Sequence, residues 1–211
     1  MAIINFLLLK KNKNLPSKSV QVEAFVEHMK LLITKEDIDL RGNNSKWQTQ
    51  FDSRFGNKKR QNVACWRACQ VILGNYNVTG GNLKNNKALF QVAIEKDNQL
   101  VVVSSVAIKA IDYLDKQLEM GKPILVGVDH TYKYKGGFNN DLSTDHFVVI
   151  IGRGNDEKGE YYLFYEVGTS YKSKGASDNN KLYVQEDYSL KGPTVYKPSH
   201  VYTITQVREN Q

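Results

Sequence analysis

The sequence predicts an α+β domain, with helices early in the chain and an antiparallel β-sheet late in the chain. Two observations favour this class. Apolar residues recur at helical spacing before residue 121, and short apolar runs separated by polar turns follow it. Helices followed by a run of strands are typical of a sheet with helices packed on it, so we expect that arrangement here.

Apolar periodicity and end signals predict three helices, at residues 17–34, 64–74 and about 105–120. Ser17 is a candidate N-cap of the first helix. Gly74 and Gly121 follow the apolar stretches of the other two, and glycine commonly ends helices. The polar segment 39–62, which leads into the second helix, is predicted to be a surface loop.

Five strands are predicted, over residues 123–128, 147–152, 161–167, 181–185 and 200–205. The first is continuously apolar, which indicates a buried strand. Residues 3–9 are also apolar, but lysines follow them instead of preceding them, so we interpret them as a strand or packing segment and not as a secretory signal peptide. We therefore expect a cytoplasmic protein in the producing cell, exported only by a dedicated secretion system.

The formal net charge of +7 comes from lysines spread over many predicted loops. Such a surface favours an anionic partner, although simple solubility explains it equally well. The aromatic and basic pattern of a nucleic-acid module is missing, so nucleic acid is not an expected partner. No apolar run is long enough for a transmembrane helix, so membrane insertion is not expected either.

Cys65 and Cys69 are four residues apart on the second predicted helix. Their side chains share a face but run parallel, which suits a disulfide poorly, so we expect both to be reduced. Cys65 lies in the first helical turn, where unpaired N–H groups and the helix dipole favour a thiolate nucleophile. Cys69, one turn deeper, suits packing. A plain core cysteine is the alternative for Cys65.

His146 is the predicted partner of Cys65, and Glu166 the predicted partner of His146. The polar segment 152–160 separates two apolar strands, and a turn centred on Asp156 places His146 opposite Glu166. A carboxylate there could orient the imidazole, which is the third role of a catalytic triad. The alternative is a surface carboxylate, because a one-residue slip of register would turn Glu166 to the other face.

The remaining candidates concern binding and the oxyanion. Gln61 is a candidate oxyanion-hole donor, with a helix cap as the alternative. His130 is the rival to His146, whereas His28 and His200 are less suited. Residues 132–138 form a candidate substrate-binding lip or a plain surface loop. Neither a metal site nor a cofactor is expected, because the cysteines and histidines lack paired zinc-ligand spacing. The expected substrate-binding residues are Trp66, Tyr132, Tyr134 and Asp145.

Three blocks of this sequence resemble the papain-like cysteine peptidase superfamily, in particular its bacteriocin-processing (double-glycine) branch. They are residues 65–76, 114–126, and 146–152 with 161–166. The resemblance implies a papain-like fold with Cys65, His146 and Glu166 as its triad. This sequence departs from the family at three places. Trp66-Arg67 stands where the family commonly has Gly-Pro or Gly after the nucleophile, and Glu166 stands where the third triad residue is usually Asp or Asn. The side-chain amide of the oxyanion hole usually lies a little further upstream than Gln61.

On this basis we expect one domain over residues 1–211, with a helical elaboration at 1–60, a catalytic core at 61–167 and C-terminal strands at 168–211. The expected activity is hydrolysis of amide bonds, most simply by an antibacterial effector that cuts peptidoglycan peptides. An immunity protein or a secretion-machine adaptor would be its partner. The alternatives are a toxin that cleaves or deamidates a protein, and a non-enzymatic binding module on a peptidase-like scaffold.

Overall fold

The computed structural model describes residues 35–42, 46–81, 89–97, 99–130 and 143–211. The predicted helix at 17–34, the apolar segment at 3–9, and the candidate binding residues Tyr132 and Tyr134 lie outside these ranges. Contacts group residues 37–211 into one compact unit, separate from residues 1–36. The fold and the site described below belong to residues 37–211.

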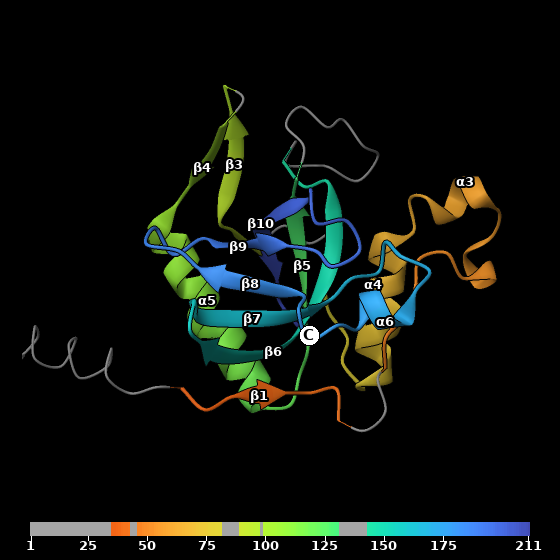
Figure 1. Ribbon diagram of the computed structural model, residues 1–211, viewed down its shortest axis with the longest axis horizontal. Helices are drawn as coiled ribbons and strands as arrows, with labels where there is room; N and C mark the ends of the chain where they lie inside the picture. Colours follow the sequence, from red (N-terminus) through yellow and green to blue (C-terminus); the bar gives the residue numbers. More distant parts are fainter. Residues whose placement is uncertain (1–34, 43–45, 82–88, 98, 131–142) are drawn as a thin grey trace, which may run out of the picture. The chain divides into compact units, whose positions relative to one another are not determined.

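Six strands form a closed antiparallel barrel in the order β6-β5-β10-β9-β8-β7, and pairing of β7 with β6 closes it (Figure 1). Two further strands join the barrel, β1 (Ile38–Asp39) along β6 and β2 (Leu89–Gln91) along β10. β3 (Ala93–Lys96) and β4 (Gln99–Val102) form a separate hairpin. The barrel strands are β5 (Ile124–Asp129), β6 (His146–Asp156), β7 (Gly159–Tyr165), β8 (Lys181–Val184), β9 (Leu190–Pro193) and β10 (Val201–Arg208).

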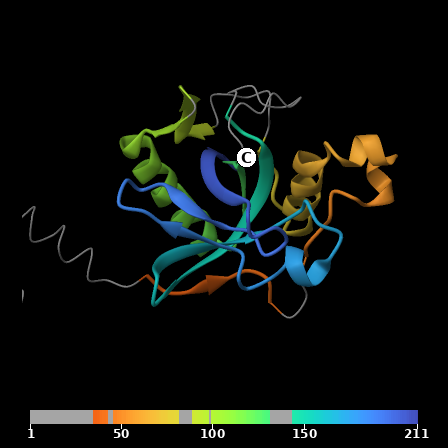
Figure 2. The same ribbon diagram turned by 45° about the horizontal axis from the view of Figure 1, so that its top comes forward.

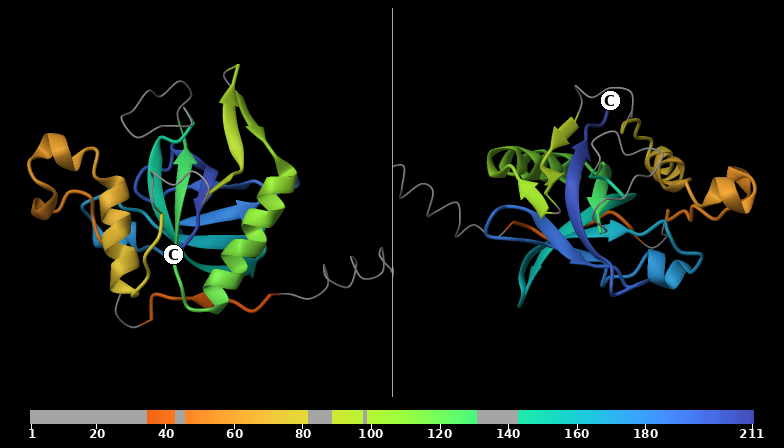
Figure 3. Two further views of the ribbon diagram at one scale, coloured as in Figure 1. Left: turned by 180° about the vertical axis from the view of Figure 1, so that it is seen from behind. Right: turned by 90° about the horizontal axis from the view of Figure 1, so that it is seen from above.

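Two longer helices flank the strands, and Figure 3 shows them on opposite sides of β5 and β6. They are α4 (Cys65–Asn75) and α5 (Ser104–Glu119). The shorter elements are α3 (Lys58–Gln61), α6 (Lys172–Gly175) and the 3-10 turn η2 (Ser53–Phe55). In Figure 2 the curvature of the strands between α4 and α5 is visible. Within the described residues, no helix has the length and apolar character needed to cross a membrane.

Alternating residues of β5, β6 and β7 point into two hydrophobic cores. On β5, Val126 and Val128 pack with α5 residues such as Leu114, while Leu125 packs with α4 residues such as Ile72. Successive side chains of a strand point to opposite faces, so a strand between two cores must be apolar on both. This explains the continuous apolar run that predicted a buried strand.

A buried charge network ties α5 to the barrel. Arg153 of β6 is 5% exposed, and its guanidinium lies 2.9 Å from Asp115 Oδ1 and 3.0 Å from Glu119 Oε1 on α5. Tyr162 Oη donates to the same Asp115 oxygen over 2.7 Å. A buried guanidinium needs such partners, because desolvating an unpaired charge is costly.

The predicted fold class, papain-like α+β with N-terminal helices packed on a C-terminal sheet, is wrong. The described residues form mostly β-structure around a closed barrel. The missed strand β9 is decisive, because it joins β8 to β10 and so completes the ring. Its sequence, Leu-Lys-Gly-Pro, buries only Leu190 and Gly192 and has little strand propensity, so composition gave no signal for it.

Most of the individual elements in the described residues are confirmed. The helices predicted at 64–74 and 105–120 are α4 and α5, and Gly121 follows α5 with φ of +72°, as a helix-ending glycine does. The five predicted strands are β5, β6, β7, β8 and β10, with ends shifted by up to several residues. The strands β1 to β4 were not predicted, and the expected loop at 39–62 contains η2 and α3.

Candidate active site

Cys65 is the first residue of α4, and the hydrophobic core fixes that helix in place. Ala68, Cys69, Ile72 and Leu73 on one face of α4 are fully buried against β5 and β6. Ala64, at the N-cap position, offers no side-chain oxygen to the first turn. The N–H groups around Cys65 therefore have no side-chain cap, and this end of the helix favours negative charge.

His146 is the first residue of β6 and pairs with Val128 of β5. Its side chain is 12% exposed. Nε2 donates a 2.8 Å hydrogen bond to Glu166 Oε1, and the Cys65 thiol lies near enough to the ring to raise the histidine pKa. Because Nε2 is engaged by Glu166, Nδ1 is the nitrogen left for Cys65. The structure thus brings together the three residues that the sequence singled out.

Glu166 follows β7 and is fully buried. Three donors satisfy its carboxylate: Oε1 accepts from His146 and from the backbone N–H of Gly168, and Oε2 accepts from Tyr202 Oη over 2.7 Å. Trp47 Nε1 donates to the backbone carbonyl of Glu166 over 2.6 Å. A buried carboxylate with this many donors stays ionised in one orientation.

Gly168 is a glycine because of crowding around this carboxylate. A Cβ at Gly168 would lie 2.9 Å from Glu166 Oε1 and 3.3 Å from His146 Cε1. Contacts below 3.0 Å are too close for a carbon and an oxygen, so a larger residue would push the ion pair apart. The glycine therefore permits the close approach of imidazole and carboxylate.

The electrostatics of the site favour an ion pair between His146 and Glu166. Burial disfavours charge on His146, but the Glu166 carboxylate and the Cys65 thiol outweigh it and raise the histidine pKa to about 10. Burial likewise opposes the charge of Glu166, yet His146, Tyr202 and Gly168 hold its pKa below the ordinary 4.5. A cationic imidazole therefore lies beside Cys65 at neutral pH.

Cys69 has the packing role that the sequence indicated. It is fully buried, and burial followed by the proximity of Cys65 and Glu166 raises its pKa well above the ordinary value. Both cysteines are free thiols. A thiol kept protonated in a core is inert, so Cys69 provides an internal control for the reactivity of Cys65.

The side chains of Gln61 and Trp66 both donate hydrogen bonds to backbone carbonyls of other loops. Gln61 Nε2 donates to the carbonyls of Gly56 (2.8 Å) and Asp52 (3.3 Å), so both amide hydrogens serve the preceding loop instead of an oxyanion hole. Trp66 is partly buried, and its indole N–H donates to Gly81 O over 2.8 Å. The indole N–H is therefore bound by the protein itself, and the substrate-binding role of Trp66 stays a prediction.

Asp145 and His130 form a unit of their own next to His146. The Asp145 side chain is 2% exposed, accepts from the backbone N–H of His130 over 3.0 Å and lies 3.7 Å from its Nδ1. His130 stacks on His200 with 4.2 Å between ring centroids. Burial, then the neighbouring His200 and His146, lowers the His130 pKa to about 4, so His130 is neutral at pH 7. Asp145 thus holds His130 and does not present its carboxylate to solvent.

Three residues of this site escaped the sequence reasoning. Tyr202 and His200 belong to the strand predicted at 200–205, and Trp47 lies in the predicted surface loop at 39–62. Each is far from His146 or Glu166 in sequence, and β10 reaches the site by pairing with β5, the strand that lies between it and β6. An isolated Tyr or Trp in a polar segment was the sole available signal.

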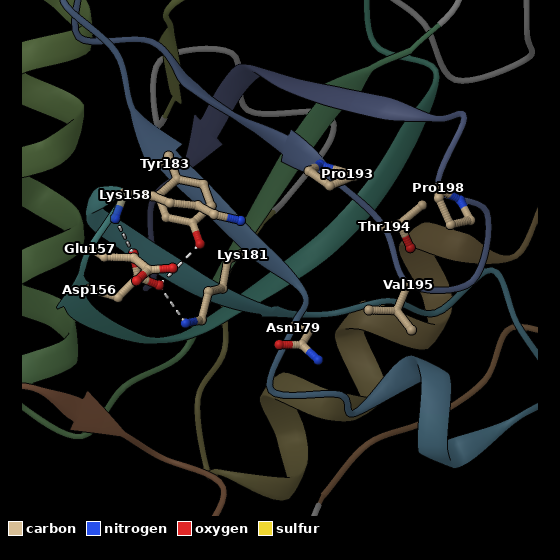
Figure 4. Close-up of a pocket in the computed structure, with 10 residues that line it drawn as sticks. All are labelled: Asp156, Glu157, Lys158, Asn179, Lys181, Tyr183, Pro193, Thr194, Val195 and Pro198. Carbon is tan, nitrogen blue, oxygen red and sulfur yellow. Dashed lines mark hydrogen bonds and ion pairs between the residues drawn. The ribbon is translucent and has the colours of Figure 1, made fainter.

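A separate cavity of about 640 Å³ lies along β8, between the turn that joins β6 to β7 and the residues that follow β9 (Figure 4). Within it Asp156 accepts from Lys181 Nζ over 2.7 Å and from Tyr183 Oη over 3.1 Å. Asp156 and Lys181 therefore neutralise each other within the cavity wall. Its walls are formed by Asp156, Glu157, Lys158, Asn179, Lys181, Tyr183, Pro193, Thr194, Val195 and Pro198, and it includes no member of the triad.

The arrangement can perform thiol chemistry without a further group. Across the described ranges, no three His, Cys, Asp or Glu side chains are grouped as metal ligands. The reactive elements are thus a cysteine at a helix start, an imidazole within reach of it, and a buried carboxylate that fixes the ring. No protein family, curated protein or solved structure matches this chain, so these contacts are the basis for assigning a function.

Proposed function

We propose that this protein is a cysteine hydrolase that cleaves amide bonds, with Cys65 as nucleophile, His146 as general base and acid, and Glu166 as the residue that orients His146. The observation that supports this most strongly is the position of His146, which is hydrogen-bonded to the buried carboxylate of Glu166 and lies near enough to the Cys65 thiol for that thiol to raise the histidine pKa. The resemblance of residues 65–76 and 146–152 to cysteine peptidases supports the same chemistry.

In the proposed reaction, the sulfur of Cys65 attacks the carbonyl carbon of the amide while its proton resides on His146. The C–N bond then breaks, and His146 gives its proton to the leaving amine. This leaves a thioester on Cys65. His146 next takes a proton from water, whose oxygen attacks the thioester, and the carboxylic acid leaves as the thiol is restored.

The role proposed for Glu166 is to keep His146 in one orientation and to stabilise its cation. Its 2.8 Å bond to Nε2 directs Nδ1 at Cys65. The raised pKa of His146 and the lowered pKa of Glu166 favour the charged pair across the neutral range. A cation next to sulfur favours the thiolate, which is the nucleophilic form.

For the substrate, we propose the peptide crosslinks of peptidoglycan, which would make the protein an antibacterial effector. The net charge of +7 supports this version, because bacterial cell walls are anionic. An immunity protein that covers Cys65, and an adaptor of a secretion machine, are partners that such an effector needs. The substrate proposal depends on composition, whereas the proposal of thiol chemistry depends on the contacts of His146.

Digestion of purified sacculi tests the full proposal. Wild-type protein should release new amino termini, and Cys65→Ala should release none. Cys69→Ala is the matched control, because it removes a buried thiol one helical turn away and should retain activity. Release by Cys65→Ala at the wild-type rate would contradict the assignment of the nucleophile.

If wild type, Cys65→Ala and Cys69→Ala all left the sacculi intact, peptidoglycan would be excluded as the substrate, but Cys65 could still be the nucleophile. Intact-mass analysis of bacterial proteins would then separate the remaining acceptors of the same nucleophile, since deamidation and cleavage change mass differently. Loss of either change in Cys65→Ala would support a toxin that modifies a protein. Absence of both, with an unreactive Cys65, would favour the non-enzymatic binding module.

A further inference from the structure

A short segment, Trp47 to Gln50, runs beside the residues that follow β7 and holds them through three hydrogen bonds. Trp47 Nε1 donates to Glu166 O over 2.6 Å, and Thr49 Oγ1 donates to Thr169 O over 2.7 Å. The backbone N–H of Gln50 donates to Val167 O over 2.9 Å. These bonds fix the main chain at Glu166 and in the residues that follow it.

The side chain of Gln50 reaches the other half of the site. Its Nε2 donates to the backbone carbonyl of Gln61 over 3.1 Å. The same carbonyl accepts the backbone N–H of Ala64 over 3.0 Å, and Ala64 is the N-cap of the helix that begins at Cys65. One residue is thus bonded both to the segment that carries Glu166 and to the turn that starts the Cys65 helix.

Gln50 is poorly explained as a purely structural residue. It is 6% exposed, and its Oε1 is buried with no hydrogen-bond partner among the described residues. A buried amide oxygen without a partner destabilises a fold, so an apolar side chain of the same size would serve packing better. What an apolar side chain cannot supply is the bond to Gln61.

We propose that Gln50 is a positioning residue that holds the Cys65 turn in register with the Glu166 segment, and so sets the contact of Cys65 with His146. This inference rests on the proposed function of the triad. Gln50 acts through the main chain on either side and is not itself a catalytic residue. The identity of the residue matters because it donates a hydrogen bond across the gap between two segments that do not pair directly through β-structure.

Gln50→Met separates positioning from packing. Methionine keeps the volume and the backbone N–H to Val167, but it removes both the bond to Gln61 and the unpartnered oxygen. The thermal midpoint should stay the same or rise. The rate of Cys65 alkylation by iodoacetamide near neutral pH should fall about tenfold to a hundredfold, because a small misplacement of reacting groups costs that much.

Gln48→Met is the matched control. Gln48 lies in the same segment, but its Nε2 donates to Thr49 O and to Asp52 Oδ2, and to neither side of the triad. Its alkylation rate should equal the wild-type rate. A Gln50→Met protein with wild-type alkylation at every pH would overturn the role of Gln50 and leave the triad standing. If Gln50→Met lowered both the thermal midpoint and the alkylation rate, Gln50 would have a structural role instead.

The proposed function can fail separately from this inference. If wild-type Cys65 reacts as an ordinary thiol, and His146→Ala does not change its rate, the triad assignment is wrong whatever Gln50 does. If wild type reacts fast and His146→Ala slowly, the result with Gln50→Met decides the positioning role alone.

Discussion

His146 and Glu166 lie on the same face of the β6–β7 ladder because β6 contains one extra residue, Ile151. Near the turn, Asp156 pairs with Gly159, a register that would turn Glu166 away from His146. Between Ile150 and Gly152 the register shifts by one residue. The bulge at Ile151 therefore restores the face on which imidazole and carboxylate meet.

The space at Gly168 gives a direct test of this contact. Gly168→Ala would place a Cβ 2.9 Å from Glu166 Oε1, so the carboxylate or the imidazole must move. We expect the alkylation rate of Cys65 to fall about tenfold or more, as misplaced groups lose reactivity. Gly74→Ala is the control, because a Cβ there meets no atom within 4 Å. It should keep the rate and stabilise the α4 helix by up to about 1 kcal/mol.

The hydroxyl of Tyr202 should contribute to stability through Glu166. Tyr202→Phe removes the 2.7 Å bond to Oε2 and leaves part of a buried carboxylate without a donor. We expect a loss of about 1–3 kcal/mol in the free energy of unfolding, measured by urea denaturation. Tyr171→Phe, at a tyrosine that is 63% exposed, should change little. Equal effects of the two substitutions would contradict the role given to Tyr202.

The ion pair predicts a pH window of maximal contribution to stability. His146 has a raised pKa, so its contribution is full below the unfolded value of 6.5 and is lost as pH rises through the folded value near 10. Glu166 has a lowered pKa, so its contribution is full above 4.5 and is lost as pH falls through the folded value. The stability difference between wild type and His146→Gln should therefore be largest at about pH 4.5–6.5 and shrink toward pH 10.

Equilibrium unfolding at a series of pH values measures this difference directly. Because other groups titrate similarly in both proteins, subtracting the His146→Gln curve isolates the pair. A difference that grows between pH 6.5 and 10 would contradict an ion pair in the folded protein.

Arg153 should stabilise the fold without affecting the reactive cysteine. Arg153→Ala leaves Asp115, whose side chain is 12% exposed, without its 2.9 Å ion-pair partner. We expect a loss of about 3 kcal/mol in unfolding free energy, because an uncompensated buried charge remains. Arg54→Ala, which breaks an ion pair at a 55% exposed side chain, should leave stability nearly unchanged. Cys65 alkylation in folded Arg153→Ala should match wild type.

The local elements of this protein could be predicted because their signals are local. The helix that begins at Cys65 has a compact apolar face, and β5 is buried on both sides, so periodicity and composition indicated each. The pairing of His146 with Glu166 was predicted from a turn centred on Asp156, whereas the observed turn lies at Glu157 and Lys158. The shared face was nevertheless correct, because the bulge offsets the shift.

Closure of the barrel could not be predicted in the same way. It depends on β9, a four-residue strand containing Lys191, Gly192 and Pro193, whose partners lie on β8 and β10. Both partners are its neighbours in sequence, but β9 itself has no compositional strand signal. The long-range step is the pairing of β10 with β5, which has little trace in local composition. Tyr202 and Trp47 reach Glu166 only through this pairing and through the path of the segment before α3, so their roles were not visible in the sequence.

The most direct test is the pH dependence of iodoacetamide alkylation, mapped separately to Cys65 and Cys69 by mass spectrometry in wild type and in His146→Ala. A catalytic pair predicts rapid labelling of Cys65 well below the pH of about 8.5 at which a free thiol ionises. That advantage should disappear in His146→Ala, while buried Cys69 stays unlabelled in both. Labelling of Cys65 with an ordinary thiol profile, unchanged by His146→Ala, would contradict the proposed active site.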